Sequence, residues 1–320
     1  MTPGKGDSTP QSGLVSASVL SFHTKSKLGN LALDLFLSEG SSREMGVNDQ
    51  ELQRFITAVG ANYRENPYHN FHHAVDTVKM MSWMLTCPVL HPNLVPNRRF
   101  MLLLSCLVHD IGHPGHSNQF EIKTKTDRAR KFKNFAVLEK YSLELTLQLL
   151  ETPGCQILHA VGEDQQAECL RMLNEMVLAT DFELHPEFMA GFRAFLEKSP
   201  VDFKNPEFLS WFSRALIKAA DIANTTKPFE EAKRWGRRIM MEFWAQGVEE
   251  KERHLAVGPY NDPHLIHVNE TQADFIRNGS MGLFETLSNL EPAFLPLVVN
   301  LKENLRRYQE MDSRGASLFD

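Results

Sequence analysis

The chain has 320 residues, of which 42% are hydrophobic and 23% charged, and its formal net charge is −6 at pH 7. These values are typical of a globular protein that buries its own core, and they exclude nucleic-acid binding driven by an overall positive field. Four well-separated cysteines without a CxxC pair favour reduced thiols. The longest apolar run, residues 100–108, is about half a membrane span. We therefore expect a soluble, cytoplasmic protein.

The first 13 residues, MTPGKGDSTPQSG, contain almost nothing to bury. Their Gly, Pro, Ser and Thr content is typical of flexible linkers. We assign residues 1–15 to a linker or an artificial N-terminal boundary, and residues 16–320 to one domain.

From there on, apolar residues recur at i, i+3 and i+4, the spacing of a buried helix face. No Asn-Gly or Asp-Gly hairpin lies between alternating runs. The sequence predicts an all-α protein of many helices, and we expect about 14–16 of them. The segments with the clearest pattern are 32–37, 76–85, 98–110, 137–150, 168–179, 187–198 and 292–311.

Residues 66–81, NPYHNFHHAVDTVKMM, contain three histidines within five positions. In a helix, His69 and His73 would share one face, whereas His72 would be turned about a quarter-circle away. Histidine serves both as metal ligand and as proton donor. The spacing alone leaves the three roles open, because a single such pair is more often structural.

Residues 108–120, VHDIGHPGHSNQF, place His109 beside Asp110, with His113 four residues after His109. Zinc accepts both imidazole nitrogen and carboxylate oxygen, and one carboxylate can bridge two ions. The alternative is an aspartate at a helix end with a capping histidine. A third candidate ligand is Asp221, whose alanine-rich surroundings make an unpaired charge unfavourable. A metal or an ion pair would relieve that burial, unless Asp221 is exposed at a helix end.

Seven segments occur in an order that resembles the catalytic domain of the class I 3′,5′-cyclic nucleotide phosphodiesterases. The resemblance covers roughly residues 40 to 310, and it implies a compact HD-type all-α fold, with a deep metal-containing pocket, over residues 16–320. The segments are YHNFHHAVD, HDIGHPGHSNQF, VLEKY, VLATDFELH, ADIANTTKP, RRIMMEFWAQG and QADFI.

The resemblance implies two divalent metals. One, zinc, would be held tightly by His73, His109, Asp110 and Asp221, and Asp110 would bridge to a second ion, magnesium or manganese. That division is chemically sensible, because zinc takes nitrogen and oxygen donors whereas magnesium keeps several waters. The positions that match residues holding metal-bound waters are His113, Glu139, Thr180 and Asp181.

The implied reaction is hydrolysis of a cyclic nucleotide to the nucleoside 5′-monophosphate by a hydroxide activated by two metals. His69 matches the general acid, and Glu242 matches the carboxylate that orients it; we expect neither role for His72. Substrate contacts are implied for Tyr68, Asn224, Ile239, Gln272 and Phe275, with Phe275 stacking on the purine and the Gln272 amide bonding its edge.

The chain departs from the family pattern in two places. Residues 139–142 read EKYS, where family members often read ENHH, and the segment 121–134 is unusually basic. We expect its part KTKTDRARKFK, residues 123–133, to form a solvated loop, with anion steering over the site as the less favoured alternative. Neither departure removes an implied metal ligand, but both leave the substrate preference open.

We expect cAMP to be favoured over cGMP, because HPGHSNQF and ADIANTTKP are most similar to the cAMP-preferring branch. Two alternatives are an HD-type phosphohydrolase acting on another nucleotide and an inactive domain that senses cyclic nucleotides. The resemblance also allows a homodimer and regulatory domains outside this chain.

Overall fold

A computed structural model describes residues 24–319; the predicted linker, residues 1–15, lies outside them. The described residues form an all-α fold without strands, which confirms the predicted class. The helices are α1 (Lys25–Glu39), α2 (Ser41–Glu44), α3 (Asp49–Asn62), α4 (Phe71–Leu85), α5 (Pro96–Val108), α6 (Asn118–Lys123), α7 (Asp127–Lys131), α8 (Val137–Leu150), α9 (Glu163–Leu178), α10 (His185–Lys198), α11 (Pro206–Asp221), α12 (Phe229–Glu252), α13 (Val268–Phe275), α14 (Met281–Leu290) and α15 (Leu295–Ser313).

Local signals explain why the three helices nearest the site begin where they do. The Asn70 side chain caps α4 by accepting from the backbone N–H groups of His72 and His73. Proline occupies the first turn of both α5 and α11, where its missing N–H leaves no helical hydrogen bond unmade. These local signals therefore set the first residue of each of the three helices.

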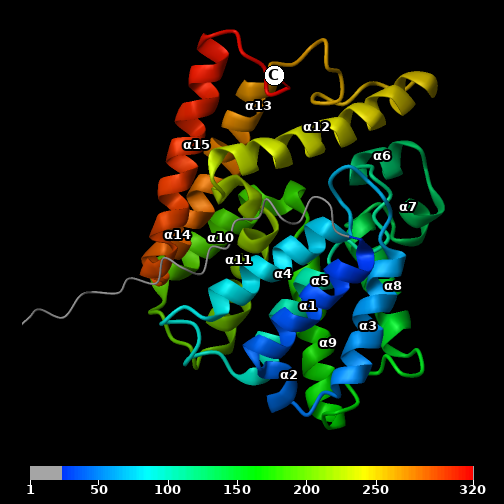
Figure 1. The fold of residues 1–320 in the computed structure, drawn as a ribbon, viewed down its shortest axis with the longest axis vertical. Coiled ribbons are helices and arrows are strands. Elements are labelled where there is room, and N and C mark those ends of the chain that lie inside the picture. Colours follow the sequence, from blue (N-terminus) through cyan, green and yellow to red (C-terminus); the bar gives the residue numbers. More distant parts are fainter. Residues whose placement is uncertain (1–23, 320) are drawn as a thin grey trace, which may run out of the picture.

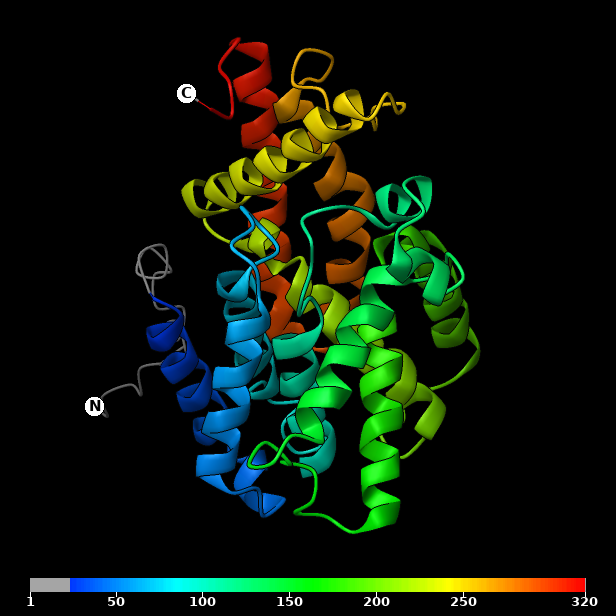
Figure 2. The ribbon, with the colours of Figure 1, turned by 90° about the vertical axis from the view of Figure 1, so that its right-hand side faces the viewer.

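The helices form two groups that meet along the central helices α4, α5 and α11. Figures 1 and 2 show α1, α2, α3, α8 and α9 gathered at one end of the molecule, and α12 to α15 at the other. Helix α4 packs against α1, α5 and α11, and α5 also packs against α9. Met80, Met81 and Met84 of α4 are all buried. Other helices thus surround the central helices, and polar side chains at the ends of the central helices can lie inside the protein.

The basic segment 123–133 differs from its prediction as a solvated loop. It includes part of α6 and all of α7. The carboxylate of Glu121, which is 1% exposed, accepts from Arg128 at 2.9 and 3.1 Å and from the Thr126 hydroxyl at 2.6 Å. The loop prediction is wrong because it treated the segment as a run of solvated charges, although a buried carboxylate pairs with one of them.

Among the helices of residues 24–319, none combines the length and the apolar character needed to span a membrane.

Candidate metal centre and active site

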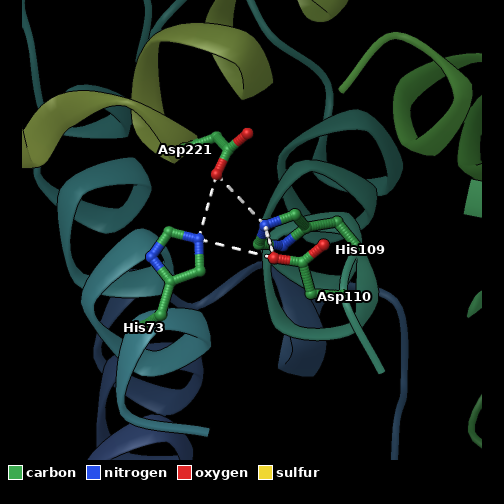
Figure 3. Close-up of side chains that lie close together, drawn as sticks. All are labelled: His73, His109, Asp110 and Asp221. Atoms are coloured by element: carbon green, nitrogen blue, oxygen red, sulfur yellow. Dashed lines mark hydrogen bonds and ion pairs between the residues drawn. The ribbon is translucent and has the colours of Figure 1, made fainter. Parts of the chain in front are cut away.

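Four side chains from three helix ends converge on one point (Figure 3). His73 comes from the first turn of α4, His109 and Asp110 directly follow α5, and Asp221 is the last residue of α11. The His73 Nε2 lies 3.0 Å from an Asp221 oxygen, and the His109 Nε2 lies 3.0 Å from an Asp110 oxygen and 3.2 Å from Asp221. One donor atom from each residue lies within 4.8 Å of the other three. The four predicted ligands therefore meet as one cluster that could hold a metal ion.

The donor set suits a divalent cation. The His109 Nδ1 donates to the backbone carbonyl of Cys106 at 2.9 Å, which leaves Nε2 with its lone pair directed at the cluster. A hydrogen bond at the far nitrogen is the usual way in which a metal-binding histidine is held in the correct tautomer. Two imidazole nitrogens and two carboxylate oxygens match the preferences of zinc.

The electrostatics of the cluster show that its carboxylates prefer a cationic neighbour. Burial acts to raise the pKa of Asp221, but the charges and hydrogen bonds of His109 and His73 outweigh it and hold that pKa below its usual range. Burial acts to lower the pKa of His109, and the charges of Asp110 and Asp221 raise it well above its usual value. The protein thus favours positive charge at this point.

His69 lies outside helix α4, so the shared helix face considered for His69 and His73 does not form. Helix α4 begins at Phe71, so His69 belongs to the turn before the capping Asn70. Glu242 of α12 holds this turn: one carboxylate oxygen accepts from the His69 Nδ1 at 2.5 Å, and the other accepts from the backbone N–H groups of Tyr68 and His69 at 2.9 and 3.0 Å. The predicted pair His69 and Glu242 is therefore in direct contact.

This contact favours a protonated imidazole at His69. Burial acts to lower its pKa, but the Glu242 carboxylate outweighs that effect and raises the pKa to about 9. The pKa of Glu242 falls to about 2, because the charge of His69 outweighs the effect of burial. The His113 ring stacks on His69 with centroids 4.1 Å apart, and burial together with the charge of His69 lowers its pKa to about 3. The pair thus carries one proton, on His69.

The remaining predicted water-holding residues lie on the side of Asp110 formed by α8 and the end of α9. Glu139 is in the first turn of α8, where its carboxylate accepts from the Asn118 amide at 3.0 and 3.3 Å. Burial, the charge of Asp181 and, to a smaller extent, that of Asp110 raise the Glu139 pKa to about 7. Thr180 and Asp181 follow α9, and the Asp181 side chain caps the next turn. A cation among these acids would offset their mutual repulsion.

The predicted substrate-binding residues come from four segments: Tyr68 precedes α4, Asn224 lies in the turn after α11, Ile239 is on α12, and Gln272 and Phe275 are on α13. The Tyr68 hydroxyl accepts from the Asn224 amide at 2.6 Å. Gln272 faces Gly236 of α12 so closely that a Cβ at Gly236 would lie 2.9 Å from the Gln272 Oε1. Ile239 is one helical turn after Gly236 and one before Glu242, so the three share a face of α12. This face leads from Gln272 to His69.

Phe275 has an aromatic neighbour that the sequence did not reveal. The Phe182 ring lies 5.1 Å from the Phe275 ring, and its other face stacks on His185 with centroids 4.8 Å apart. Phe182 follows Thr180 and Asp181 inside a segment used for the resemblance, VLATDFELH, but its partner is distant in sequence. Only the fold brings the two rings together.

Two other features near the site were not predicted. Lys227 lies 2.5 Å from an Asp76 oxygen and 2.9 Å from Glu231, and it joins α4 to the start of α12. In the sequence, the signal for this ion pair was the opposite charge of Asp76 in AVD and Lys227 in NTTKP. His72 stacks on Trp235, and burial with the charge of Arg238 lowers its pKa to about 4. His72 belongs to neither histidine cluster, as expected.

The family model for 3′5′-cyclic nucleotide phosphodiesterases matches residues 68–301, which include every predicted site residue from Tyr68 to Phe275. The chain belongs to this family. A solved structure of this kind, LmjPDEB1 in complex with IBMX, superposes with a TM-score of 0.85 at 28% sequence identity, covering 89% of this chain and 87% of that one. The phosphodiesterase fold is thus confirmed both by sequence and by structure.

Curated phosphodiesterase relatives include proteins named for either nucleotide. The 3′,5′-cyclic-AMP phosphodiesterase 4C of Rattus norvegicus is 32% identical over 81% of the chain, and the high-affinity cGMP-specific phosphodiesterase 9A of Pan troglodytes is 30% identical over 85%. The 3′,5′-cyclic-nucleotide phosphodiesterase regA of Dictyostelium discoideum is 31% identical over 92%. The chain spans 46%, 50% and 38% of the 9A, 4C and regA proteins, about half their length or less.

Proposed function

We propose that this chain hydrolyses 3′,5′-cyclic nucleotides to nucleoside 5′-monophosphates. The observation that carries the proposal is the pairing of His69 with Glu242 beside the four-residue His/Asp cluster. The His69 Nδ1 is 2.5 Å from Glu242, and the ring centroids of His69 and His73 are 6.0 Å apart. The imidazole that we propose as the proton donor therefore lies next to the cluster that we propose to hold metal, an arrangement suited to phosphodiester cleavage.

His73, His109, Asp110 and Asp221 would hold the tight ion, which we propose to be zinc. Asp110 would also bridge to a magnesium or manganese ion whose waters are held by His113, Glu139, Thr180 and Asp181. When bound, the two ions would supply charge for the phosphate oxygens and lower the pKa of the attacking water. Burial, and after it the charge of Asp181, raises the pKa of Glu139, so a cation on that side would stabilise its ionised carboxylate.

His69 would act on the leaving group. As the water oxygen bonds to phosphorus, the P–O3′ bond breaks, and the His69 Nε2 gives its proton to O3′. Glu242 occupies Nδ1 and both backbone N–H groups of the turn, so Nε2 is the nitrogen left to donate. General acid catalysis of this type contributes roughly 10²–10⁴-fold.

Gln272, Phe275, Ile239, Asn224 and Tyr68 would bind the nucleoside. A glutamine amide offers both a donor and an acceptor, so it can address adenine or guanine according to its orientation. We propose cAMP as the preferred substrate on the resemblance of HPGHSNQF and ADIANTTKP. Identity to relatives does not decide this point, because cAMP-named and cGMP-named proteins match almost equally. Homodimerisation, regulatory domains outside this chain and a cytoplasmic location stay predictions.

The test is to incubate the protein with cAMP and with cGMP and to identify the product by phosphorus NMR. We expect the 5′-monophosphate from both, a higher kcat/KM for cAMP, and loss of turnover on chelation. Binding without turnover in metal-loaded protein would favour the sensor alternative. Turnover of other nucleotides alone would favour the broader HD-type phosphohydrolase.

A further inference from the structure

The turn that carries His69 is joined to the turn that carries His113 by one side chain, that of Asn66. Its Nδ2 donates to the backbone carbonyl of His69 at 2.8 Å and to the backbone carbonyl of His113 at 2.8 Å. The second contact spans 47 positions of the chain. Asn66 therefore links the turn before α4, which carries His69, to the segment after α5, which carries His113.

The linked segments carry the two halves of the proposed reaction. The His113 N–H donates to the Asp110 carbonyl at 3.0 Å, which places the His113 turn directly against a proposed metal ligand. On the other side, Glu242 fixes the His69 ring and N–H but makes no contact with the His69 carbonyl. Asn66 supplies that missing constraint, so its amide connects the backbone of the proton donor to the metal centre.

The geometry around Asn66 admits an amide and disfavours its acid counterpart. Both acceptors of Nδ2 are carbonyl oxygens, so both hydrogens of the NH₂ group are used. Gly115, at φ +85°, lies so close that a Cβ there would be 3.2 Å from the Asn66 Oδ1. The Asn66 carbonyl in turn accepts from the Asn70 amide at 2.7 Å, which ties the turn to the cap of α4. In Asn66→Asp, a carboxylate oxygen would take the place of the Nδ2 group. It would face the His69 and His113 carbonyl oxygens, which accept hydrogen bonds and cannot donate one.

We propose that Asn66 is a positioning residue that holds the general acid His69 in register with the metal centre through its two hydrogen bonds to the His69 and His113 carbonyls. The inference rests on the proposed function. A displacement of His69 by a fraction of an ångström affects proton donation to O3′ more than phosphate binding. Misplacing a catalytic group by about 1 Å can reduce the rate by about 10²-fold.

The test compares Asn66→Asp with the wild type on two substrates, cAMP and its analogue with sulfur in place of O3′. A thiolate leaves without a proton, because a thiol has a pKa of about 8.5, far below that of an alcohol. We expect kcat for cAMP to fall about 10- to 100-fold. For the sulfur analogue we expect a fall of less than about threefold. Asn62→Asp is the matched control, because Asn62 is exposed and donates only to the Ala58 carbonyl of its own helix.

Asn66→Ala removes both donors without adding a charge, and it serves as a second variant if Asn66→Asp does not fold. Equal losses on the two substrates, or unchanged kcat for cAMP, would overturn the inference. Loss of bound metal or of cooperative melting in both variants would also overturn it, because Asn66 would then support the fold rather than His69. Failure of the wild type to hydrolyse either cAMP or cGMP would instead refute the proposed function.

Discussion

The site contains two clusters of histidine and carboxylate that lie side by side and differ in their balance of charge. The first brings two imidazoles, His73 and His109, to two carboxylates, Asp110 and Asp221. The second brings two imidazoles, His69 and His113, to the single carboxylate of Glu242. With neutral imidazoles the first cluster has a net charge of −2 and attracts a divalent cation. The second needs only one proton on His69 to be neutral.

The two clusters also differ in how the chain builds them. The first lies at helix ends that the buried core fixes in place. The second depends on a turn before α4 that donates hydrogen bonds to Glu242 and accepts one from Asn66. The same residue types can thus hold a metal or a proton, according to the number of carboxylates and the groups that satisfy them.

The largest effect is expected from removing a carboxylate of the first cluster. Asp221→Ala, like His109→Ala, should abolish tight metal binding and lower kcat more than about 10³-fold, because the remaining donors cannot hold the ion. Elemental analysis of the purified variants measures the metal content. Asp312→Ala, at an exposed position, is the control. Full metal content with normal turnover would refute the ligand assignment.

A smaller effect is expected from the second cluster. His69→Ala should retain the metal content of the wild type while kcat falls roughly 10²–10⁴-fold, because only proton donation is lost. His72→Gln is the control within the same stretch, since the His72 ring stacks on Trp235 outside both clusters. If His69→Ala lost its metal, the distinction between the clusters would be wrong.

The pH dependence sharpens the role of Glu242. The working form of His69 is protonated, and its pKa is about 9, so activity should be lost as the pH rises through that value. In Glu242→Gln the pKa should return towards about 6.5, so that at pH 8 the protonated fraction, and with it kcat, falls about 30-fold. The measurement is kcat against pH, with the exposed Glu252→Gln as control. Superimposable profiles for Glu242→Gln and the wild type would contradict the pairing.

The smallest effect is expected at the base end, far from either cluster. Gln272→Ala should raise KM about tenfold with little change in kcat, because it removes hydrogen bonds to the base that are worth about 1–1.5 kcal/mol in ground and transition state alike. Steady-state kinetics with cAMP and cGMP measure the change. A fall in kcat without a change in KM would show that Gln272 acts on the reaction rather than on binding.

Periodicity predicted the helical class, whereas the four members of the first cluster came from the ordered motifs that resemble the phosphodiesterases. The spacing of His69 and His73 would put them on one face only if both were helical, and Asn70 caps α4 and leaves His69 in the preceding turn. The contacts of Asn66, Phe182 and Lys227 depend on partners far along the chain, so no local pattern could reveal them. The buried Glu121 likewise explains why residues 121–131 include helical turns.

The difference between the two clusters is tested most directly by anomalous diffraction at the zinc absorption edge from crystals of the zinc-loaded protein. We predict a strong peak among the His73 Nε2, His109 Nε2, Asp110 and Asp221 oxygens, and none among His69, His113 and Glu242. A peak at the second cluster, or none at the first, would contradict the assignment of metal to one and proton to the other.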